Sequence, residues 1–475
     1  MKLLKSGTKP LGWGESFLCL ALAVVFFQLT YVSIRIPAAG LLIFGYAFFL
    51  VRLTDQPTVR RAFYFGLTAG FVCAAGQAFF FWKIFGPAAI VLWLVFAFWI
   101  GLFTAISCRC ILRWGKAKAV WLIPFFWTGF EYFRSELYYF KFSWLNIGYA
   151  FPNFQLFPID GLGMYFVGLF IFAIASGISF REFVKKKWAI VFCIGLVLLI
   201  PLTWMRSVIV GAKHERPTPP LDLVGVQLEF PSIGVITKML DHALAKNTNA
   251  PIFVLSEYTL EGPVSDSLKN WCREHSRYLV VGGKDPVGTD NFYDTAFVVG
   301  TNGEVIFKQA KSVPIQFFKD GLPARTQEVW DSPWGKIGIC ICYDLSYTRV
   351  TDRLVQEGAQ LLIVPTMDVE DWGRHEHELH SRVAPVRAAE YGVPIFRVAS
   401  SGISQAIGRY GYVIAQTSIP GVGEVLSADL RLPIAGTLPS DRFLAPFCVG
   451  VTGIVLVALL ILAWNDKRIK PGTLP

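Results

Sequence analysis

Long apolar runs are the feature of this 475-residue chain that most restricts its fold. A helix needs about 20 apolar residues to cross a bilayer. Only 16% of the residues are charged, against about 25% in an average soluble domain. The sequence therefore predicts a polytopic membrane protein with about eight transmembrane helices. The predicted spans are residues 14–34, 38–53, 63–84, 88–108, 118–136, 163–180, 188–206 and 445–464.

Basic residues predict how these spans are oriented. Lys and Arg cluster before the first span and after the second, fourth, sixth and eighth, so every second connection is basic. Because cytoplasmic loops carry the excess of Lys and Arg, we expect both termini in the cytoplasm and the long stretch after the seventh span outside it, in the periplasm of a Gram-negative-like cell. The same loops account for much of the net charge of +10, so no nucleic-acid partner is predicted.

Three regions follow from this pattern. Residues 1–214 are expected to form the membrane domain, residues 215–435 an extracytoplasmic domain, and residues 436–475 a final transmembrane helix with a cytoplasmic tail. The middle region alternates short apolar runs with segments of helical character, among them 233–246 and 376–391, which is typical of an α/β fold. The nine cysteines are scattered and show no disulfide or zinc pattern.

Three positions in the middle region have side chains suited to nucleophilic catalysis. Glu257 follows the apolar run PIFVLS at the expected carboxyl end of a strand, where open α/β sheets place their chemistry. Cys342 follows the run KIGICI at an expected turn, and a thiol there can act as a nucleophile if a base or cation assists it. Lys308 and Lys311 lie on opposite faces of one expected strand, so only one of them can reach a shared site.

In this order, Glu257, the lysine and Cys342 resemble the nitrilase, or carbon–nitrogen hydrolase, superfamily. Further segments extend the resemblance over residues 221–430, and they are LVGVQLEF at 223–230, IVPTMD at 363–368 and the stretch 386–414. The resemblance implies an αββα sandwich with a Glu-Lys-Cys triad. Lys311 is the preferred lysine because it precedes Ser312-Val313-Pro314.

The membrane region narrows the resemblance further. The segments 121–151, with Glu131, Arg134 and Trp144, and 155–163 resemble the apolipoprotein N-acyltransferase family. The resemblance implies a bacterial inner-membrane enzyme that needs no cofactor or metal. Its donor would be a membrane phospholipid, and its acceptor the α-amine of the diacylglyceryl-cysteine of an apolipoprotein. The acyl chain would pass through a thioester on Cys342.

Two departures from the family pattern concern the site. The family has a Gly-Glu pair in the loop after the lysine, whereas this chain reads KSVPIQFFKDG, and whether Asp320 replaces the missing carboxylate is left open. Asp344 stands where the family generally has Glu.

Further site candidates are less specific. Tyr343, Asp344, Trp372 and His380 are candidates for the oxyanion site or for positioning substrate, and the aromatic loops around Phe317-Phe318 and Trp372 are candidate lids. Glu131 and Arg134, three residues apart, are expected to share one helical face. The run HEHELH at 375–380 is not interpreted as a metal site, because no further ligand cluster accompanies it.

Three other functions remain open from the sequence. The chain could be a membrane-anchored amidase or hydrolase in which water resolves the thioester. It could be an acyltransferase with a different amine acceptor. It could also be a non-catalytic lipoprotein-binding protein on the same scaffold, although the presence of Glu257, Cys342 and a suitable lysine disfavours that interpretation.

Overall fold

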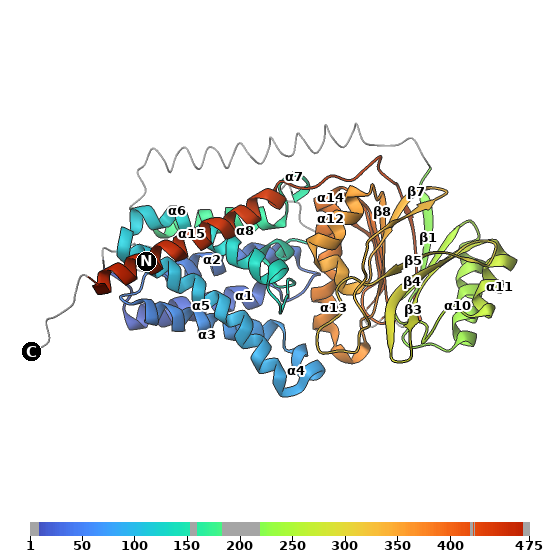
Figure 1. Cartoon of the computed structure of the whole chain (residues 1–475), viewed down its shortest axis with the longest axis horizontal. Coiled ribbons are helices and arrows are strands. Elements are labelled where there is room, and N and C mark those ends of the chain that lie inside the picture. Colours follow the sequence, from blue (N-terminus) through green and yellow to red (C-terminus); the bar gives the residue numbers. More distant parts are fainter. Residues whose placement is uncertain (1–8, 153–158, 183–218, 419–420, 422, 469–475) are drawn as a thin grey trace, which may run out of the picture.

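The computed structural model describes residues 9–152, 159–182, 219–418, 421 and 423–468. A bundle of helices forms one half of the molecule and an α/β domain the other (Figure 1). The N-terminus lies near the end of the bundle farthest from the α/β domain, and the last helix runs back toward that same end (Figure 1).

Helices occur at every predicted span except 188–206, which lies outside the described residues. Three of them are long and apolar enough to cross a membrane, at Trp13–Thr30, Phe80–Trp114 and Asp441–Asp466, and Pro37–Arg52 and Met164–Ser179 are shorter apolar helices. The bundle is thus compatible with a membrane domain, and the number of spans stays a prediction. The helices are α1 (Trp13–Thr30), α2 (Ile43–Arg52), α3 (Val59–Gln77), α4 (Phe80–Phe85), α5 (Ala89–Trp114), α6 (Lys116–Tyr132), α7 (Ile159–Leu162), α8 (Met164–Ser179) and α15 (Asp441–Arg468).

The prediction of one helix over 63–84 is wrong at its carboxyl end. Helix α3 ends at Gln77, and a turn at Ala78-Phe79 leads into α4. The indole of Trp93 donates a hydrogen bond of 3.0 Å to the Ala78 carbonyl and so satisfies one of the acceptors at this helix end. Hydropathy could not locate the turn, because the residues on both sides of it are apolar.

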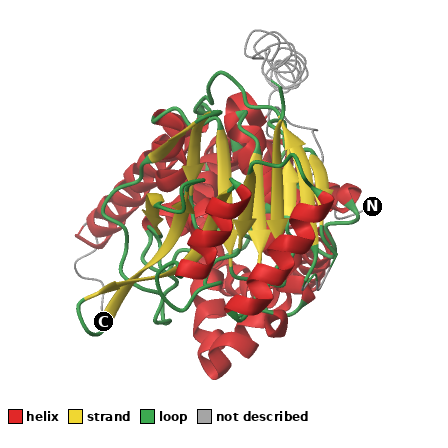
Figure 2. Cartoon of the chain, turned by 90° about the vertical axis from the view of Figure 1, so that its right-hand side faces the viewer, coloured by secondary structure: helices red, strands yellow, loops and turns green. Residues whose placement is uncertain are grey.

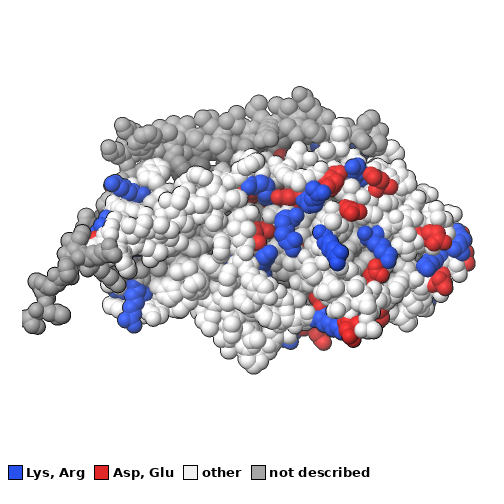
Figure 3. Space-filling model, viewed as in Figure 1, with Lys and Arg blue, Asp and Glu red and all other residues white. Residues whose placement is uncertain are grey.

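Charge is distributed unevenly over the surface. Lys, Arg, Asp and Glu gather on the α/β domain, while the face of the bundle visible in Figure 3 is almost free of them except at its far end. Large apolar side chains project from α15, where Phe443 is 85% and Ile454 72% exposed. An apolar surface of this kind suits contact with lipid rather than water.

The α/β domain contains two six-stranded sheets. Their strand orders are β12-β1-β2-β3-β4-β5 and β11-β10-β9-β8-β7-β6. Parallel pairs lie in the middle of each sheet, β1–β2–β3 in the first and β7–β8–β9 in the second. The strands are β1 (Leu221–Val226), β2 (Ile252–Leu255), β3 (Tyr278–Val287), β4 (Asn291–Val299), β5 (Val305–Ala310), β6 (Val329–Ser332), β7 (Gly335–Ile339), β8 (Leu361–Thr366), β9 (Ile395–Ala399), β10 (Gln405–Ile407), β11 (Val413–Gln416) and β12 (Val425–Leu430).

Helices cover both outer faces and complete an αββα sandwich. Helices α10 (Ile233–Lys246) and α11 (Asp266–His275) cover the first sheet, as Figure 2 shows from that side. The first core lies between these two helices and the first sheet. A second core forms where apolar side chains of the two sheets meet. Helices α12 (Thr348–Gln356), α13 (Arg374–Ser381) and α14 (Val383–Tyr391) lie between the second sheet and the bundle (Figure 1).

The third core is shared by the two halves of the molecule. One continuous cluster of buried apolar side chains includes Phe27 and Phe103 of the bundle together with Leu354 and Val383 of the α/β domain. Buried polar contacts cross the same boundary, including the 2.9 Å hydrogen bond from the Met164 amide to Glu390. The bundle therefore serves as the packing partner of the second sheet's helices.

Candidate active site

The predicted catalytic side chains follow strands that end at one edge of the sandwich. Glu257 lies just beyond β2, Lys311 just beyond β5 and Cys342 just beyond β7. Cys342 opens a tight 3-10 turn, Cys342–Ser346, with φ of +49°. A non-glycine residue seldom adopts a positive φ, and such strain is characteristic of active sites. The turn places the thiol at the end of the strand, where it is buried and lines the cavity described below.

Lys311, rather than Lys308, reaches Glu257. The Lys311 ammonium is fully buried and lies 2.7 Å from Glu257 Oε1 and 2.8 Å from Asp320 Oδ2. Lys308 lies on the opposite face, half exposed, and pairs with Asp285 at 2.9 Å. The strand alternation predicted this separation, and the preference for Lys311 agrees with the geometry.

Asp320 provides a carboxylate beside Lys311. The sequence had left open whether it replaces the Glu of the family's Gly-Glu pair. Besides contacting Lys311, it accepts hydrogen bonds from the Tyr258 hydroxyl at 2.8 Å and from the Ile315 amide at 2.6 Å. Burial by itself lowers the pKa of Lys311, but the carboxylates of Asp320 and Glu257 outweigh it and raise that pKa well above its ordinary value. Lys311 is therefore a permanent cation in this site.

Asp294, on β4, is a third carboxyl near the ammonium. Its Oδ2 lies 3.6 Å from Lys311 Nζ, and neither of its oxygens has a hydrogen-bond partner within the described part of the chain. Burial raises the pKa of Asp294 well above its ordinary value, and neighbouring Glu257 raises it further. Glu257, Asp294 and Asp320 could geometrically hold a metal ion, but the Lys311 ammonium is the cation that they surround.

The backbone of Met367 links the acid and the thiol. Its amide donates to Glu257 Oε2 at 2.6 Å, and its carbonyl lies 3.8 Å from Cys342 Sγ. Burial raises the pKa of the Cys342 thiol well above its ordinary value, and the Glu257 carboxylate adds to the increase. The resting cysteine is thus a neutral thiol that needs a base, and Glu257 is the neighbouring carboxylate.

Asp344, a sequence candidate for positioning substrate, is not among the residues that line the cavity described below. Its carboxylate accepts hydrogen bonds from the amides of Ser312 at 3.0 Å and Val313 at 2.7 Å. These contacts hold the residues that follow Lys311. Asp344 therefore holds the loop after β5 in place. No local sequence pattern identifies this contact between distant segments.

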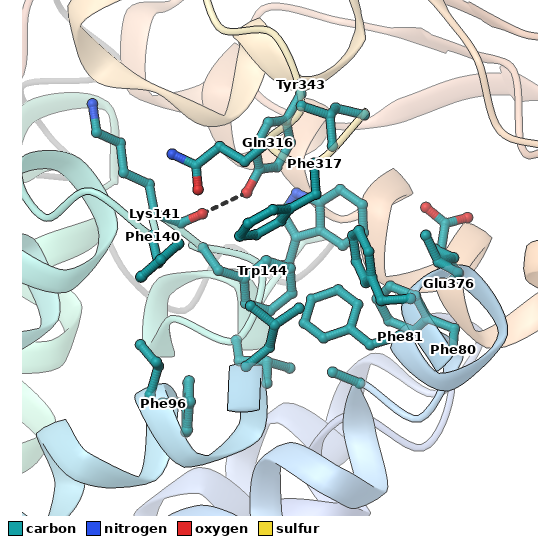
Figure 4. A pocket seen from close by; sticks show the side chains of 18 of the residues that line it. Phe80, Phe81, Phe96, Phe140, Lys141, Trp144, Gln316, Phe317, Tyr343 and Glu376 are labelled. Atoms are coloured by element: carbon teal, nitrogen blue, oxygen red, sulfur yellow. Dashed lines mark hydrogen bonds between the residues drawn. The ribbon is translucent and has the colours of Figure 1, made fainter. Parts of the chain in front are cut away.

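A cavity opens at Cys342 and is walled by both halves of the molecule (Figure 4). Aromatic rings from α4, α5 and the loop after α6 face rings from the α/β domain across it. Phe317, one of the predicted lid residues, stacks on Phe140 at 5.8 Å between ring centroids and is 68% exposed. The lining residues include Phe80, Phe81, Phe96, Phe140, Trp144, Phe317, Cys342, Tyr343, Trp372 and His380.

Tyr343 and Trp144 join the helical bundle to the turn that begins at Cys342. The Tyr343 hydroxyl donates a 2.8 Å hydrogen bond to the Lys141 carbonyl (Figure 4), and the Trp144 indole donates one of 3.0 Å to Ser346 Oγ. Trp144 also stacks on His380, with ring centroids 4.4 Å apart. The cavity wall and the nucleophile turn therefore form one unit.

Glu131 and Arg134 hold the loop that carries Trp144. The Glu131 carboxylate accepts from the Ile147 amide at 2.9 Å, and Arg134 donates to the Phe142 carbonyl at 2.9 Å and to Asn146 Oδ1 at 2.6 Å. Arg134 lies in a π-helical turn, Phe133–Leu137, which displaces it from regular helical spacing. Of the two, only Arg134 lines the cavity.

The HEHELH segment lies on α13 beside the cavity. His380 Nδ1 donates to Asp368 Oδ1 at 2.7 Å, and Arg397 pairs with Asp368 Oδ2 at 2.5 Å. Asp368, Glu376 and His380 are close enough to hold an ion. However, both Asp368 oxygens are already engaged by protein groups, so the arrangement is not a vacant ligand set.

The sequence did not identify several residues of the site. Asp294, Glu376, Tyr347 and the Met367 amide come from segments far apart in the chain, and only the folded sheets bring them together. Phe80 and Phe81 were assigned to a transmembrane span, yet they form part of the cavity wall.

Comparison with known proteins agrees with this two-part organisation. Residues 218–439 match the carbon–nitrogen hydrolase family model, and residues 25–178 match the model of the apolipoprotein N-acyltransferase N-terminal domain. An apolipoprotein N-acyltransferase from Geobacter metallireducens is 23% identical over 434 residues, which are 78% of this chain and 82% of the relative. The omega-amidase NIT2-B of Xenopus laevis is 26% identical over 196 residues, which are 36% of this chain and 68% of that protein.

Solved structures similar to this chain include an amidase and a member of the nitrilase superfamily. An amidase from Nesterenkonia sp. AN1 is 17% identical with a TM-score of 0.40, covering 46% of this chain and 92% of its own. Nit3 of Saccharomyces cerevisiae is 20% identical with a TM-score of 0.39, covering 45% of this chain and 91% of its own. From the two family models and the relative that spans both regions, the chain belongs to the nitrilase superfamily and combines its domain with the N-terminal domain of apolipoprotein N-acyltransferases.

Proposed function

We propose that this protein transfers a fatty acyl chain from a membrane phospholipid to the N-terminal α-amine of diacylglyceryl-cysteine in apolipoproteins. The observation that carries the proposal is the apolar cavity that begins among α4 and α5 of the bundle and ends at Cys342. A water-soluble amide needs no such wall. An acyl chain does, since each CH₂ group that leaves water gains about 0.8 kcal/mol.

The first half of the reaction would transfer the acyl chain to the enzyme. Glu257 takes the thiol proton as Cys342 Sγ attacks the ester carbonyl. Lys311 and the Tyr343 backbone amide stabilise the oxyanion. The ester C–O bond then breaks, and Glu257 returns the proton to the leaving alkoxide. The products are a lysophospholipid and a thioester on Cys342.

The second half would release the chain as an amide. The acceptor amine attacks the thioester carbonyl, and Glu257 takes a proton from the nitrogen. The C–S bond breaks and the sulfur recovers the proton. The 2.7 Å contact between Lys311 and Glu257 supports this cycle, because it places the cation that would stabilise the oxyanion beside the carboxylate that would take the proton.

The arrangement of the two halves supports the predicted topology. Residues 1–214 and 436–475 would lie in or along the bacterial inner membrane with both termini cytoplasmic, and residues 215–435 would form the periplasmic catalytic domain. The α/β domain lies at one end of the bundle, and α15 runs from it toward the other (Figure 1).

The test uses purified protein in phospholipid–detergent micelles with a diacylated lipopeptide that has a free amine. Mass spectrometry would follow both the peptide and Cys342, in the wild type and in Cys342→Ala. We expect one added acyl mass on the peptide amine with the wild type and none with the variant. Release of free fatty acid in place of acylated peptide would refute the proposal and indicate a hydrolase.

A further inference from the structure

Glu376 is the acidic residue among the described side chains that line the cavity. It lies on α13 and lines the same cavity as Phe80 and Phe81, and Figure 4 shows it at the cavity wall. The proposed reaction does not use it. Cys342 lines the same cavity, so a group that binds Glu376 would share that space with the thioester.

The Glu376 carboxyl group is buried without a partner. The residue is 1% exposed, and neither carboxyl oxygen makes a hydrogen bond within the described part of the chain. The nearest basic nitrogens are His377 Nε2 at 3.6 Å and His380 Nδ1 at 4.0 Å. Each of these nitrogens has a closer partner, His377 Nε2 with the Val369 carbonyl at 2.9 Å and His380 Nδ1 with Asp368 at 2.7 Å.

An unpartnered buried carboxyl group is costly and requires an explanation. Burial raises the pKa of Glu376 well above its ordinary value, and neighbouring Asp368 raises it further. Burial thus disfavours the charged form of this carboxyl group unless a cation accompanies it. A cationic ligand that entered the cavity would favour the charged form of Glu376 and would provide the hydrogen-bond partner that the described residues do not.

The surroundings favour an ammonium group over other ligands. Aromatic rings in the cavity wall offer faces that attract cations, and a carboxylate forms charge-assisted hydrogen bonds with ammonium. A metal ion is a poorer fit, because Asp368 already binds Arg397 and His380. Phosphate and carboxylate ligands would be repelled by an ionised Glu376 and gain nothing from a neutral one beyond a single hydrogen bond.

We propose that Glu376 binds the primary ammonium group of a substrate in the cavity beside Cys342. This inference rests on the proposed function, which supplies two sources of that group. One is the α-amine of the acyl acceptor, and the other is the headgroup of an aminophospholipid donor.

Two arms of one experiment distinguish these sources. The first measures formation of acyl-Cys342 from phosphatidylethanolamine and, separately, from phosphatidylglycerol, which has no amine. The second adds diacylated free-amine lipopeptide to enzyme already acylated from phosphatidylglycerol. The proteins are wild type, Glu376→Gln and the control Glu370→Gln, which changes an exposed carboxylate six residues away.

We expect Glu376→Gln to form acyl-Cys342 from phosphatidylglycerol at the wild-type rate, which shows that the variant is folded. It should lose about 10-fold or more in one other step, as expected for one charge-assisted hydrogen bond. Slower transfer to the lipopeptide identifies the acceptor amine as the ligand, and slower acylation from phosphatidylethanolamine identifies the headgroup. Glu370→Gln should match the wild type in every step.

An inhibition measurement tests the inference if Glu376→Gln folds poorly. Dodecylammonium should slow acylation from phosphatidylglycerol in the wild type and in Glu376→Asp more than neutral dodecanol does. Equal inhibition by the two compounds would overturn the inference. The inference would also be overturned if Glu376→Gln matched the wild type in both arms. The same holds if this variant were slowed equally with phosphatidylethanolamine and with phosphatidylglycerol. A wild type that acylates Cys342 but never the lipopeptide would refute the proposed function itself, and the inference with it.

Discussion

Replacing Lys311 by Met should damage both stability and catalysis, whereas replacing Lys308 by Met should damage neither. Lys311 is fully buried between Glu257 at 2.7 Å and Asp320 at 2.8 Å. Removing one partner of a buried ion pair costs about 3–5 kcal/mol. In a domain of this size each kcal/mol lowers Tm by about 2–4 °C, so we expect a decrease of about 6–20 °C.

The catalytic loss follows from the same position. Lys311 is the proposed side-chain donor to the oxyanion, and losing one such donor typically slows reaction about 100- to 1,000-fold. Lys308 provides the matched control, since it lies three residues away, is half exposed, and pairs with Asp285 at the surface. A surface pair of this kind contributes about 0–1 kcal/mol.

The assay combines thermal unfolding in detergent with the rate of acyl-Cys342 formation, measured well below both melting temperatures. Slow acylation by Lys311→Met at a temperature where it is folded would separate catalysis from stability. The reasoning is refuted if Lys311→Met melts within about 2 °C of the wild type, or if Lys308→Met is the variant that fails to acylate.

Three further predictions concern the same site. Because the pKa of Cys342 is raised by burial and Glu257, its alkylation by iodoacetamide should accelerate steadily from pH 7 to pH 10, with Cys342→Ala as the blank; a plateau below pH 7 would mean a resting thiolate. Gly282→Ala places a Cβ 2.5 Å from Glu257 Cα, so we expect about 1–3 kcal/mol of destabilisation and slower acylation, and an unchanged Tm would contradict the close approach. Asp344→Ala leaves the Ser312 amide unpaired and should cost about 1–3 kcal/mol, visible in thermal unfolding, while Asp344→Asn should retain part of the stability.

Local patterns were sufficient to predict several of the elements and the positions of the strand-end residues. The helix expected over 233–246 is α10 itself, because its apolar spacing is regular and its ends are polar. Glu257 and Cys342 were recognisable because each follows an apolar strand directly. The choice between Lys308 and Lys311 also followed from strand alternation together with the Ser-Val-Pro that follows Lys311.

Contacts between distant segments explain what the sequence could not predict. Asp344 was interpreted as a substrate contact, yet its partners lie about 30 residues away in the loop after β5. The helix expected over 376–391 is interrupted at Arg382 between α13 and α14. The unpaired state of Glu376 is likewise a property of the assembled cavity, since it depends on neighbours that bind one another instead.

The close packing of α15 against α6 bears on how the protein is made. A Cβ on Gly129 would lie 2.7 Å from the Cys448 carbonyl, so the two helices touch backbone to backbone. Residues 441–468 follow the other described helices and both sheets in the chain. During synthesis the surface of α6 around Gly129 therefore stays uncovered until α15 packs against it. A chain that stops before residue 441 would contain Glu257, Lys311 and Cys342 and still lack this contact, so the contact reports whether α15 has been made.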